Sequence, residues 1–315
     1  MNHTTVSIVL SVYNEAGGLQ GMWERLHAVL DTMPTRRFEV IWVNDGSSDG
    51  SQQVIDTICT APHSPHIAHV ALEFSRNFGH EAAMIAGIDN ASGAVLICMD
   101  ADGQHPPPLL PAMLAACEQG AEIVLMERKR RADNGFIKNT LSKTFYLVIN
   151  ALSVFRFQEN STDFFLLAGP VPAVLRDSYR ERNRFIRGFI QSIGFRKVVL
   201  PFEAPGRIHG GSSYSYRGLL QLGLNAVFSF SSKPLRLSVL VTLVFLLFTL
   251  VFAAYSLYKY LVDDRTPSGY TTIVLFLSVS FSVLFTVLTI LSLYFSKAIQ
   301  EMRQRPIYII RKRSG

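Results

Sequence analysis

The sequence predicts an α/β domain with a mostly parallel sheet, followed by two membrane-spanning helices near the C-terminus. Up to about residue 127, short β-rich runs alternate with segments of helical pattern, an order typical of parallel strands joined by crossover helices. Beyond Ser232, the stretches Leu237–Tyr258 and Tyr270–Ser296 contain no charged residue. Each is longer than the roughly 20 helical residues that cross a hydrocarbon core.

The first predicted strand, Val6–Tyr13, is an apolar run that is too short to cross a membrane and lacks the basic leader of a signal peptide. Further β-rich runs predict strands at Phe38–Val43, Ile67–Phe74, Ala94–Met99 and Ile123–Glu127. The helical patterns between the strands predict helices at Gly18–Asp31, Ser51–Cys59, Gly79–Asn90 and Pro107–Gln119.

Three of these strands end in polar and acidic residues, and open α/β sheets bind ligands just outside the carboxyl ends of their strands. The first strand runs into Tyr13-Asn14-Glu15, the second into residues 44–50 (NDGSSDG) and the fourth into residues 100–104 (DADGQ). Each alone is also explained by ordinary turn and N-cap chemistry. Three of them on one edge of a sheet indicate a binding site.

The pair Asp100 and Asp102 favours a metal. Residues two apart in an extended segment point the same way, so these carboxylates can converge, with Gln104 following them. Mg²⁺ typically takes one or two carboxylates while substrate phosphates complete its shell, and Mn²⁺ prefers similar oxygen ligands. Since the sequence contains no glycine-rich phosphate loop, Mg²⁺ or Mn²⁺ is the expected partner of a bound diphosphate.

The charges that flank the two apolar stretches predict their orientation. The loop 259–269 between them carries equal numbers of basic and acidic residues, whereas the outer flanks are strongly basic. The basic residues of these flanks are Lys233, Arg236, Lys297, Arg303, Arg305, Arg311, Lys312 and Arg313. This excess of Lys and Arg predicts that both termini and the α/β domain lie in the cytoplasm.

The overall charge and the cysteines agree with this location. A net charge of +6 suits a protein that rests on an anionic membrane surface, and no basic-aromatic motif indicates nucleic acid as a partner. Cys59, Cys98 and Cys117 are odd in number and lie in apolar settings, which suits a reducing compartment without a disulfide framework.

Several motifs in a fixed order resemble those of family 2 glycosyltransferases of GT-A fold. They are "SIVLSVYNE", "VNDGSSDGS", "FSRNFGHEAAMIAGID" and "MDADGQHPP". More narrowly, the chain resembles polyprenyl-phosphate glycosyltransferases, which include dolichyl-phosphate mannosyltransferases and bactoprenol glucosyltransferases. That resemblance continues through "ERNRFIRGFIQSIGF", "GRIHGGSSYS", "FSFSSKPLR" and "EMRQRPIYII", so it covers nearly the whole chain.

The resemblance implies roles for individual residues. The nucleotide would be held by Tyr13, Glu15, Asp45 and Asp100, and the metal by Asp100, Asp102 and Gln104. Arg128 and Arg207 would contact phosphate and, with Asp102, form the catalytic set, while Arg184 and Arg187 would lie near the acceptor.

Five positions depart from the usual family pattern. Ser11 stands where proline is common, Asn44 where aspartate is common, Gly103 where leucine is common, Phe165 where arginine is common, and Ser213 where lysine is common. The last two remove basic side chains from the expected phosphate region. They therefore leave the details of acceptor binding and the identity of the sugar open.

The chain is expected to divide into four parts. Residues 1–165 would form the nucleotide-sugar-binding catalytic domain, 166–232 an acceptor-side segment, 233–296 the two membrane helices and 297–315 a basic cytoplasmic tail. The segments 134–155 and 217–232 are apolar with few charges. Each is expected either to lie at the membrane interface or to pack on the catalytic domain.

The activity implied by the resemblance is a metal-dependent, inverting transfer of one sugar to a polyprenyl phosphate of undecaprenyl or dolichyl type, at the cytoplasmic face of the inner membrane. The donor would be a UDP-sugar, with UDP-glucose the first choice, and a homotetramer would match related enzymes. One alternative is a non-catalytic membrane partner of a glycan-assembly complex. A processive polysaccharide synthase is disfavoured because it would need a Gln-x-x-Arg-Trp motif, and the only tryptophans are Trp23 and Trp42.

Overall fold

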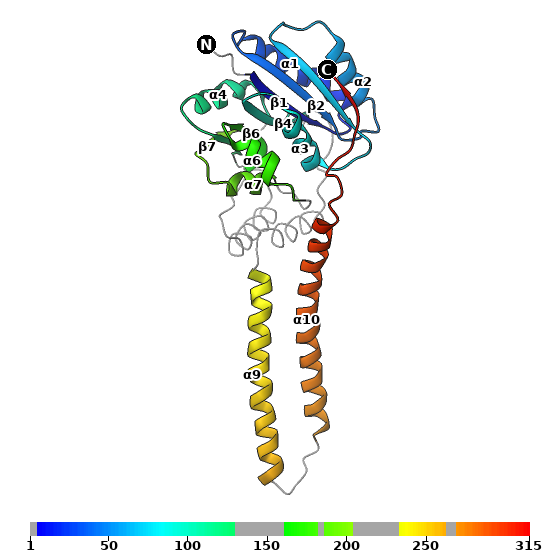
Figure 1. Ribbon diagram of the computed structural model, residues 1–315, viewed down its shortest axis with the longest axis vertical. Coiled ribbons are helices and arrows are strands. Elements are labelled where there is room, and N and C mark those ends of the chain that lie inside the picture. Colours follow the sequence, from blue (N-terminus) through cyan, green and yellow to red (C-terminus); the bar gives the residue numbers. More distant parts are fainter. Residues whose placement is uncertain (1–4, 130–160, 182–185, 204–232, 263–268) are drawn as a thin grey trace. The chain divides into compact units, whose positions relative to one another are not determined.

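The computed structural model describes residues 5–129, 161–181, 186–203, 233–262 and 269–315 (Figure 1). The chain divides into two compact units. The first unit contains the N-terminal domain together with Arg305–Gly315, and the second contains two long helices. The C-terminal residues therefore belong to the same unit as the N-terminal ones.

The first unit is built on one sheet with the strand order β7-β5-β6-β4-β1-β2-β3-β8. Strands β4, β1, β2 and β3 pair in parallel with one another, and so do β5 and β7. Strand β6 pairs antiparallel with β4 and β5, and β8 pairs antiparallel with β3. The strands are β1 (Thr5–Val12), β2 (Arg37–Asn44), β3 (Ile67–Phe74), β4 (Val95–Asp100), β5 (Ile123–Arg128), β6 (Ser161–Ala168), β7 (Lys197–Phe202) and β8 (Ile310–Ser314).

Helices cover both faces of this sheet. On one face, α1 (Ala16–Asp31), α2 (Ser51–Thr60) and α4 (Leu110–Glu118) pack their apolar side chains into the main core, around the buried Trp42. On the other face lies α3 (His80–Asn90), in contact with α6 (Val171–Ser178). The short helix α7 (Ile186–Ser192) contacts β6.

The predicted α/β class with a mostly parallel sheet is confirmed. The five predicted strands are present, and none of their ends is shifted by more than one residue. The predicted helices are present with ends shifted by at most two residues, and the last begins with a 3₁₀ turn at Pro107–Leu109. The sequence reading missed β6, β7 and β8, and the expected boundary at residue 165 falls inside β6. Strand β6 is an antiparallel insertion between β4 and β5, a pairing that local sequence pattern does not encode.

Most of the basic residues near the C-terminus belong to regular secondary structure and not to a separate tail. Residues expected to form a separate tail, 297–315, are divided between the last helix and β8, which pairs with β3 at the edge of the sheet. Arg311 lies 3.5 Å from Glu73, Lys312 donates to Asp56 at 3.1 Å, and Arg313 donates to Asn90. A strand made of such residues lacks the β-branched run that identifies strands in sequence.

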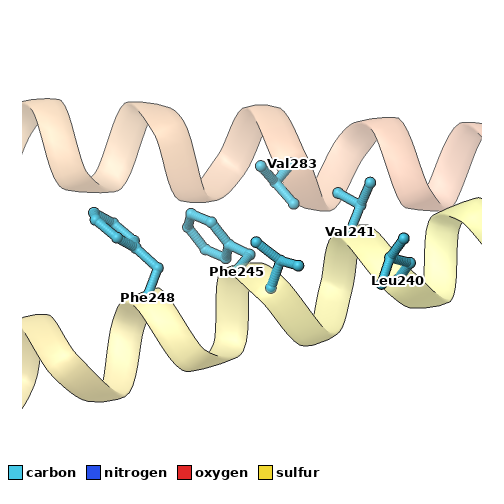
Figure 2. Close-up of a pocket in the computed structure, with 6 residues that line it drawn as sticks. Leu240, Val241, Phe245, Phe248 and Val283 are labelled. Carbon is cyan, nitrogen blue, oxygen red and sulfur yellow. The ribbon is translucent and has the colours of Figure 1, made fainter.

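The second unit contains two helices that are long and apolar enough to cross a membrane. Within α9 (Lys233–Val262) and α10 (Tyr270–Met302), the segments Leu235–Tyr255 and Thr272–Met302 have mean hydropathies of 2.7 and 2.5. The helices meet where Phe252 stacks on Phe276, with ring centroids 5.1 Å apart. Beside this contact, Figure 2 shows an apolar groove lined by Leu240, Val241, Val244, Phe245, Phe248 and Val283.

Almost none of the apolar surface of α9 and α10 is buried within the described chain. Contiguous exposed apolar surface of this extent is typical of a membrane-facing or partner-facing element, and not of a core helix in a soluble domain. The segments 134–155 and 217–232, expected as interfacial or packed helices, lie outside the described residues.

Gly87 lets α3 lie against β1. A Cβ atom built at Gly87 would lie 2.1 Å from Cγ1 of Val9, whereas one built at Gly21 in α1 would meet nothing within 4 Å. Both glycines lie inside helices, where alanine is intrinsically favoured by about 1 kcal/mol. The two positions therefore form a matched pair.

We expect Gly87→Ala to lower the free energy of unfolding by about 1–3 kcal/mol, because the added methyl group overpacks the contact with Val9. Gly21→Ala should raise it by roughly 0.5–1 kcal/mol. Denaturant titration of both purified variants in detergent checks this. Equal stability of the two variants would show that α3 does not pack closely on β1.

A cluster of histidines surrounds the two tryptophans. Trp42 Nε1 donates to His69 Nδ1 at 3.1 Å, so the proton of His69 sits on Nε2. The ring of His69 lies 4.3 Å from that of His63 and 4.7 Å from that of Trp23. Burial first, and then the neighbouring His63 and His27, lowers the pKa of His69 from 6.5 to about 4.

This pKa makes stability depend on pH. The unfolded chain takes up a proton on His69 near pH 6.5, whereas the folded chain resists protonation until about pH 4. Stability should therefore fall as pH falls through this window, by at most about 3 kcal/mol. Thermal unfolding followed by tryptophan fluorescence between pH 7 and 4 checks this, and His69→Gln should flatten the profile. An unchanged slope in His69→Gln would contradict the assignment.

Candidate active site

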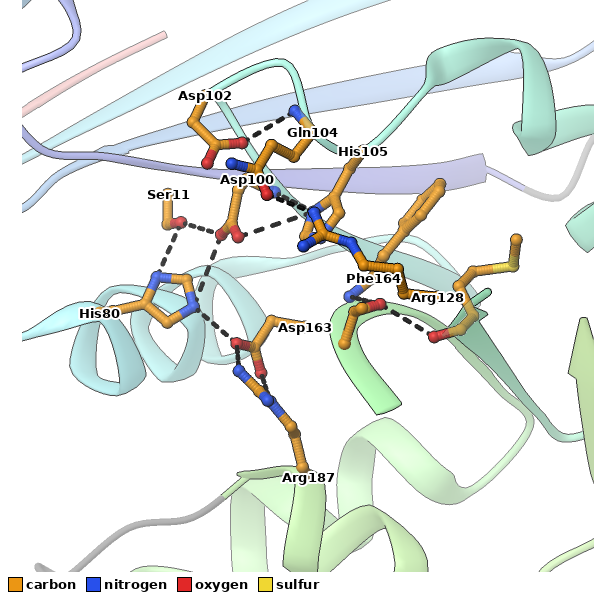
Figure 3. Close-up of polar contacts among 12 residues, drawn as sticks. Ser11, His80, Asp100, Asp102, Gln104, His105, Arg128, Asp163, Phe164 and Arg187 are labelled. Atoms are coloured by element: carbon orange, nitrogen blue, oxygen red, sulfur yellow. Dashed lines mark hydrogen bonds and ion pairs between the residues drawn. The ribbon is translucent and has the colours of Figure 1, made fainter. Parts of the chain in front are cut away.

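The carboxyl ends of β1, β2 and β4 meet at one edge of the sheet. Ser11 pairs in register with Asp100, and Val12 with Asn44. Ser11 Oγ donates to Asp100 Oδ1 at 2.9 Å and lies 3.1 Å from Nδ1 of His80 (Figure 3). A proline at position 11 could make neither contact, so this departure from the family pattern supplies a hydroxyl to the site.

The loops that follow β1 and β2 are tied to each other. Asn14 adopts a left-handed conformation with φ 54°, its backbone N–H donates to Ser47 Oγ, and its side-chain oxygen accepts from the N–H of Ser48. Asp49 accepts from the N–H of Ala16 and from Ser51. Burial alone would raise the pKa of Asp49, but these donors outweigh it and lower the pKa. The predicted nucleotide-binding residues Tyr13 and Glu15 are thus carried on a braced loop.

Tyr13 has an exposed side chain, whereas Glu15 makes a hydrogen bond through its backbone. The side chain of Tyr13 is 49% exposed at the end of β1, where a planar ligand can reach it. The backbone N–H of Glu15 donates to Ser51 Oγ at 3.0 Å, which links the start of α1 to the start of α2.

Asp45 is buried, and it holds a loop. Its two carboxylate oxygens accept from the backbone N–H groups of Phe78 and Gly79 at 2.6 and 2.9 Å. Burial is the largest influence and raises the pKa of Asp45, although these donors and nearby cations oppose it. A nucleoside contact by Asp45 stays a prediction, because both oxygens already serve the connection between β3 and α3.

A network of charged side chains lies beside Asp100 (Figure 3). Arg187 donates through Nε to Asp163 Oδ1 at 2.6 Å, and its Nη2 donates to Oδ2. His80 Nε2 lies 3.3 Å from Asp163 Oδ2 and 3.5 Å from Asp100 Oδ1. The imidazole is therefore placed between two carboxylates that come from different strands.

The pKa values follow from these contacts. Burial by itself would lower the pKa of His80, but Asp100 and Asp163 outweigh burial and raise it to about 10. Burial would raise the pKa of Asp163, yet Arg187 and His80 hold it well below its usual range. At neutral pH the network thus contains charged His80, Asp163 and Arg187.

The turn after β4 is closely defined. Asp102 Oδ1 accepts from the backbone N–H of Gln104 at 2.9 Å, and the Gln104 amide oxygen accepts from Arg128. Gly103 between them has φ +79°, a conformation that leucine, the common residue here, would adopt only with strain. Glycine adopts this left-handed conformation without strain.

His105 hydrogen-bonds to the end of β4. The backbone N–H of Asp100 donates to His105 Nδ1 at 2.8 Å, and the ring stacks on Phe164 with centroids 5.1 Å apart. Burial is the main cause of its lowered pKa. His105 is thus a neutral packing residue whose Nδ1 fixes the backbone of Asp100.

The site offers two carboxylate ligands, Asp100 and Asp102, to a divalent metal ion. Within the described part of the chain, no group of three His, Cys, Asp or Glu side chains could hold a metal ion. Asp100 and Asp102 supply two carboxylates at the end of β4, which suffices for Mg²⁺ or Mn²⁺ when substrate phosphates complete the shell. The Gln104 oxygen, expected as a third ligand, faces Arg128 instead.

The structure brings most of the predicted site residues to one edge. Those at this edge are Tyr13, Glu15, Asp45, Asp100, Asp102, Gln104 and Arg128. Arg187, expected near the acceptor, forms an ion pair with Asp163 beside Asp100. Arg184, Arg207 and Ser213 lie outside the described residues. Phe165 is fully buried in β6, so its departure from arginine is a change in the core.

Ser11, His80 and Asp163 lie outside the set of site residues that the sequence predicts. At the helix start in "NFGHEAA", the sequence supports a capping or packing role for His80 as well as a catalytic one. Asp163 stands at the start of the apolar run FFLLA, and a single acidic residue entering a buried strand is the signal that could have found it.

Comparisons with known proteins agree on one family. The family model described as glycosyl transferase family 2 matches residues 7–182. CsbB of Bacillus subtilis, named as a glycosyltransferase, is 33% identical over 99% of this chain and 93% of its own length. The SfII prophage-derived bactoprenol glucosyl transferase of Shigella flexneri is 29% identical over 98% of this chain and 97% of its own.

One solved structure with a similar arrangement is the mannosyl-3-phosphoglycerate synthase of Rubrobacter xylanophilus. It has a TM-score of 0.45 and 16% sequence identity, with 84% of this chain and 78% of that chain covered.

The ion pair between Arg187 and Asp163 yields a stability prediction. Asp163 is only 5% exposed, so Arg187→Met leaves a buried carboxylate with His80 alone. We expect a loss of about 3 kcal/mol in the free energy of unfolding, the low end for breaking a buried pair. The double variant Arg187→Met/Asp163→Asn should recover part of this loss in denaturant titrations. Equal stability of the wild type and Arg187→Met would show that the pair does not stabilise the fold.

Proposed function

The chain belongs to glycosyl transferase family 2, and on that premise we propose that this glycosyltransferase moves one sugar from a nucleoside-diphosphate donor to a polyprenyl phosphate at the cytoplasmic face of a membrane. The observation that carries the proposal is the pair of carboxylates, Asp100 and Asp102, at the strand end where β1, β2 and β4 meet. UDP-glucose is the proposed donor, because relatives similar over nearly their whole length are named bactoprenol glucosyl transferases.

The side chains of the proposed site have different roles in binding the donor. Tyr13 is exposed on the loop after β1 and can stack on the nucleoside base. Asp100 and Asp102 would hold Mg²⁺ or Mn²⁺ against the diphosphate. When bound, the ion would stabilise the negative charge that develops on the leaving nucleoside diphosphate. Arg128, at the end of β5, donates to the side-chain oxygen of Gln104. Its guanidinium can move to a phosphate oxygen and add positive charge at the same place.

A phosphate acceptor does not need a general base in the site. A phosphate monoester has a second pKa near 6, so it is largely dianionic at neutral pH and is already a nucleophile. His80 and Asp163 are both held charged by their neighbours. We therefore assign them to orienting Asp100 and not to removing a proton. A single displacement of this kind inverts the configuration at the sugar.

Membrane attachment suits a lipid acceptor, whose phosphate lies at the level of the headgroups. The apolar stretches of α9 and α10 are each long enough to span a bilayer. The chain enters α9 after the first unit and returns from α10 into β8 of that unit's sheet. An even number of spans and the basic outer flanks together support a first unit that lies in the cytoplasm.

The direct test is an assay of sugar transfer. Purified full-length protein is incubated with radiolabelled UDP-glucose, undecaprenyl phosphate and Mn²⁺ or Mg²⁺, and the lipid is then extracted. We expect labelled glycolipid, with other nucleotide sugars tested in parallel. The absence of glycolipid with every donor would overturn the proposal in favour of a non-catalytic membrane partner.

Asp102→Ala should lower transfer by at least about a thousandfold, because the metal ion that neutralises the diphosphate would lose one of its two proposed carboxylate ligands. The protein should stay folded, since Asp102 lies in a turn. Asp177→Ala, which removes an exposed aspartate in α6, is the control and should retain full activity. Wild-type turnover by a folded Asp102→Ala variant would contradict the assignment.

A further inference from the structure

We infer that Tyr308, which lies in the C-terminal segment just before β8, is a positioning residue of the active site. This inference rests on the proposed function for its effect on catalysis, but its structural basis is independent of the substrate. Tyr308 contacts both ends of the polypeptide that carries His80, namely the end of β3 and the end of α3.

The first contact is with the end of β3. The backbone N–H of Ser75 donates to the carbonyl of Ile309 at 3.0 Å, and the pairing of β3 with β8 shifts in register at this point. The ring of Tyr308 stacks on Phe74 with centroids 5.3 Å apart and an interplanar angle of 8°. Phe74 is buried, and the ring of Phe78 also meets it, edge-on, with centroids 5.7 Å apart.

Phe78 belongs to the short connection that leads from β3 to His80. Its backbone N–H donates to Asp45, as does that of Gly79. The backbone of Arg76 presses so closely on Gly46 that a Cβ atom there would lie 2.3 Å from the Arg76 carbonyl carbon. The connection is thus clamped between the loop after β2 and the stacked rings of Phe74 and Tyr308.

The second contact is with the C-terminal end of α3. Tyr308 Oη donates to Asp89 Oδ2 at 2.9 Å, while Arg180 donates to Asp89 Oδ1 at 2.7 Å. Burial, and then Asp89, raises the pKa of Tyr308 to about 12, so the hydroxyl remains a donor. Arg176 adds hydrogen bonds to the carbonyls of Ile88 and Ala91.

These contacts hold α3 at both ends. His80 is its first residue and Asp89 lies at its last turn, so a shift of the helix along or across the sheet would move the imidazole relative to Asp100 and Asp163. Tyr308 contacts Phe74, the last residue before the connection to α3, and Asp89 in the last turn of α3. Tyr308 follows the end of α10 by only a few residues in the sequence.

The test uses three variants of the full-length protein. Tyr308→Ala removes both contacts, Tyr308→Phe keeps the stack on Phe74 and loses the bond to Asp89, and Ile309→Ala is the control. Ile309 adjoins Tyr308, but its side chain is 49% exposed and only its backbone carbonyl bonds to β3. Hydrogen exchange measured by mass spectrometry and steady-state transfer kinetics are the two readouts.

We expect Tyr308→Ala to speed hydrogen exchange about tenfold or more in a peptide covering residues 75–90, with no change in the peptides of α1 and α2. Transfer should fall between about tenfold and a hundredfold in kcat, because His80 and its partners are displaced. Tyr308→Phe should recover most of the protection of residues 75–79 and part of the kcat, and Ile309→Ala should match the wild type in both readouts.

Unchanged exchange in residues 75–90 of Tyr308→Ala would overturn the inference. So would an increase spread equally over the whole first unit, since that would mean a general loss of stability. A failure of the proposed function looks different, because then no variant and no wild-type protein makes glycolipid. The exchange comparison still decides the role of Tyr308 in that case.

Discussion

The buried carboxylate of Asp163 fixes the arrangement on which the rest of the site depends. It enters the site from β6, the antiparallel strand between β4 and β5, and it faces Arg187 on one side and His80 on the other. A buried charge is tolerated only when such partners compensate it. His80 in turn faces Asp100, which also accepts from Ser11. One buried charge thus orders two helices, two strands and the first carboxylate of the expected metal pair.

The parallel sheet supplies the frame in which this network is useful. Registered pairing brings the ends of β1, β2 and β4 level with each other, and the loops that follow them brace one another through Asn14, Ser47 and Asp49. Asp45 accepts from the backbone of the connection to α3, and Tyr308 from the C-terminal segment stacks on Phe74, at the point where β3 enters that connection. Consequently, the residues that face the proposed diphosphate are carried on loops that are fixed by packing and hydrogen bonds before any substrate binds.

Much of this arrangement could be predicted from sequence, and the rest could not for physical reasons. Strands β1 to β5 and the helices between them follow from local apolar pattern, and the acidic strand ends follow from the rule that parallel strands present their carboxyl ends together. The partners of Asp163, the insertion of β6 and the return of β8 depend on pairings between distant segments. Strand β8 has basic residues at three consecutive positions, Arg311 to Arg313, and is a strand because it pairs antiparallel with β3, while Glu73, Asp56 and Asn90 receive these side chains.

The central claim is that Asp100 and Asp102 form an incomplete metal site which a nucleoside diphosphate completes. Electron paramagnetic resonance of Mn²⁺ titrated into the purified full-length protein, with and without UDP, tests this claim without requiring turnover. Weak Mn²⁺ binding in the absence of UDP, and binding at least about tenfold tighter in its presence, is the predicted result. Mn²⁺ affinity that is the same with and without UDP would contradict it.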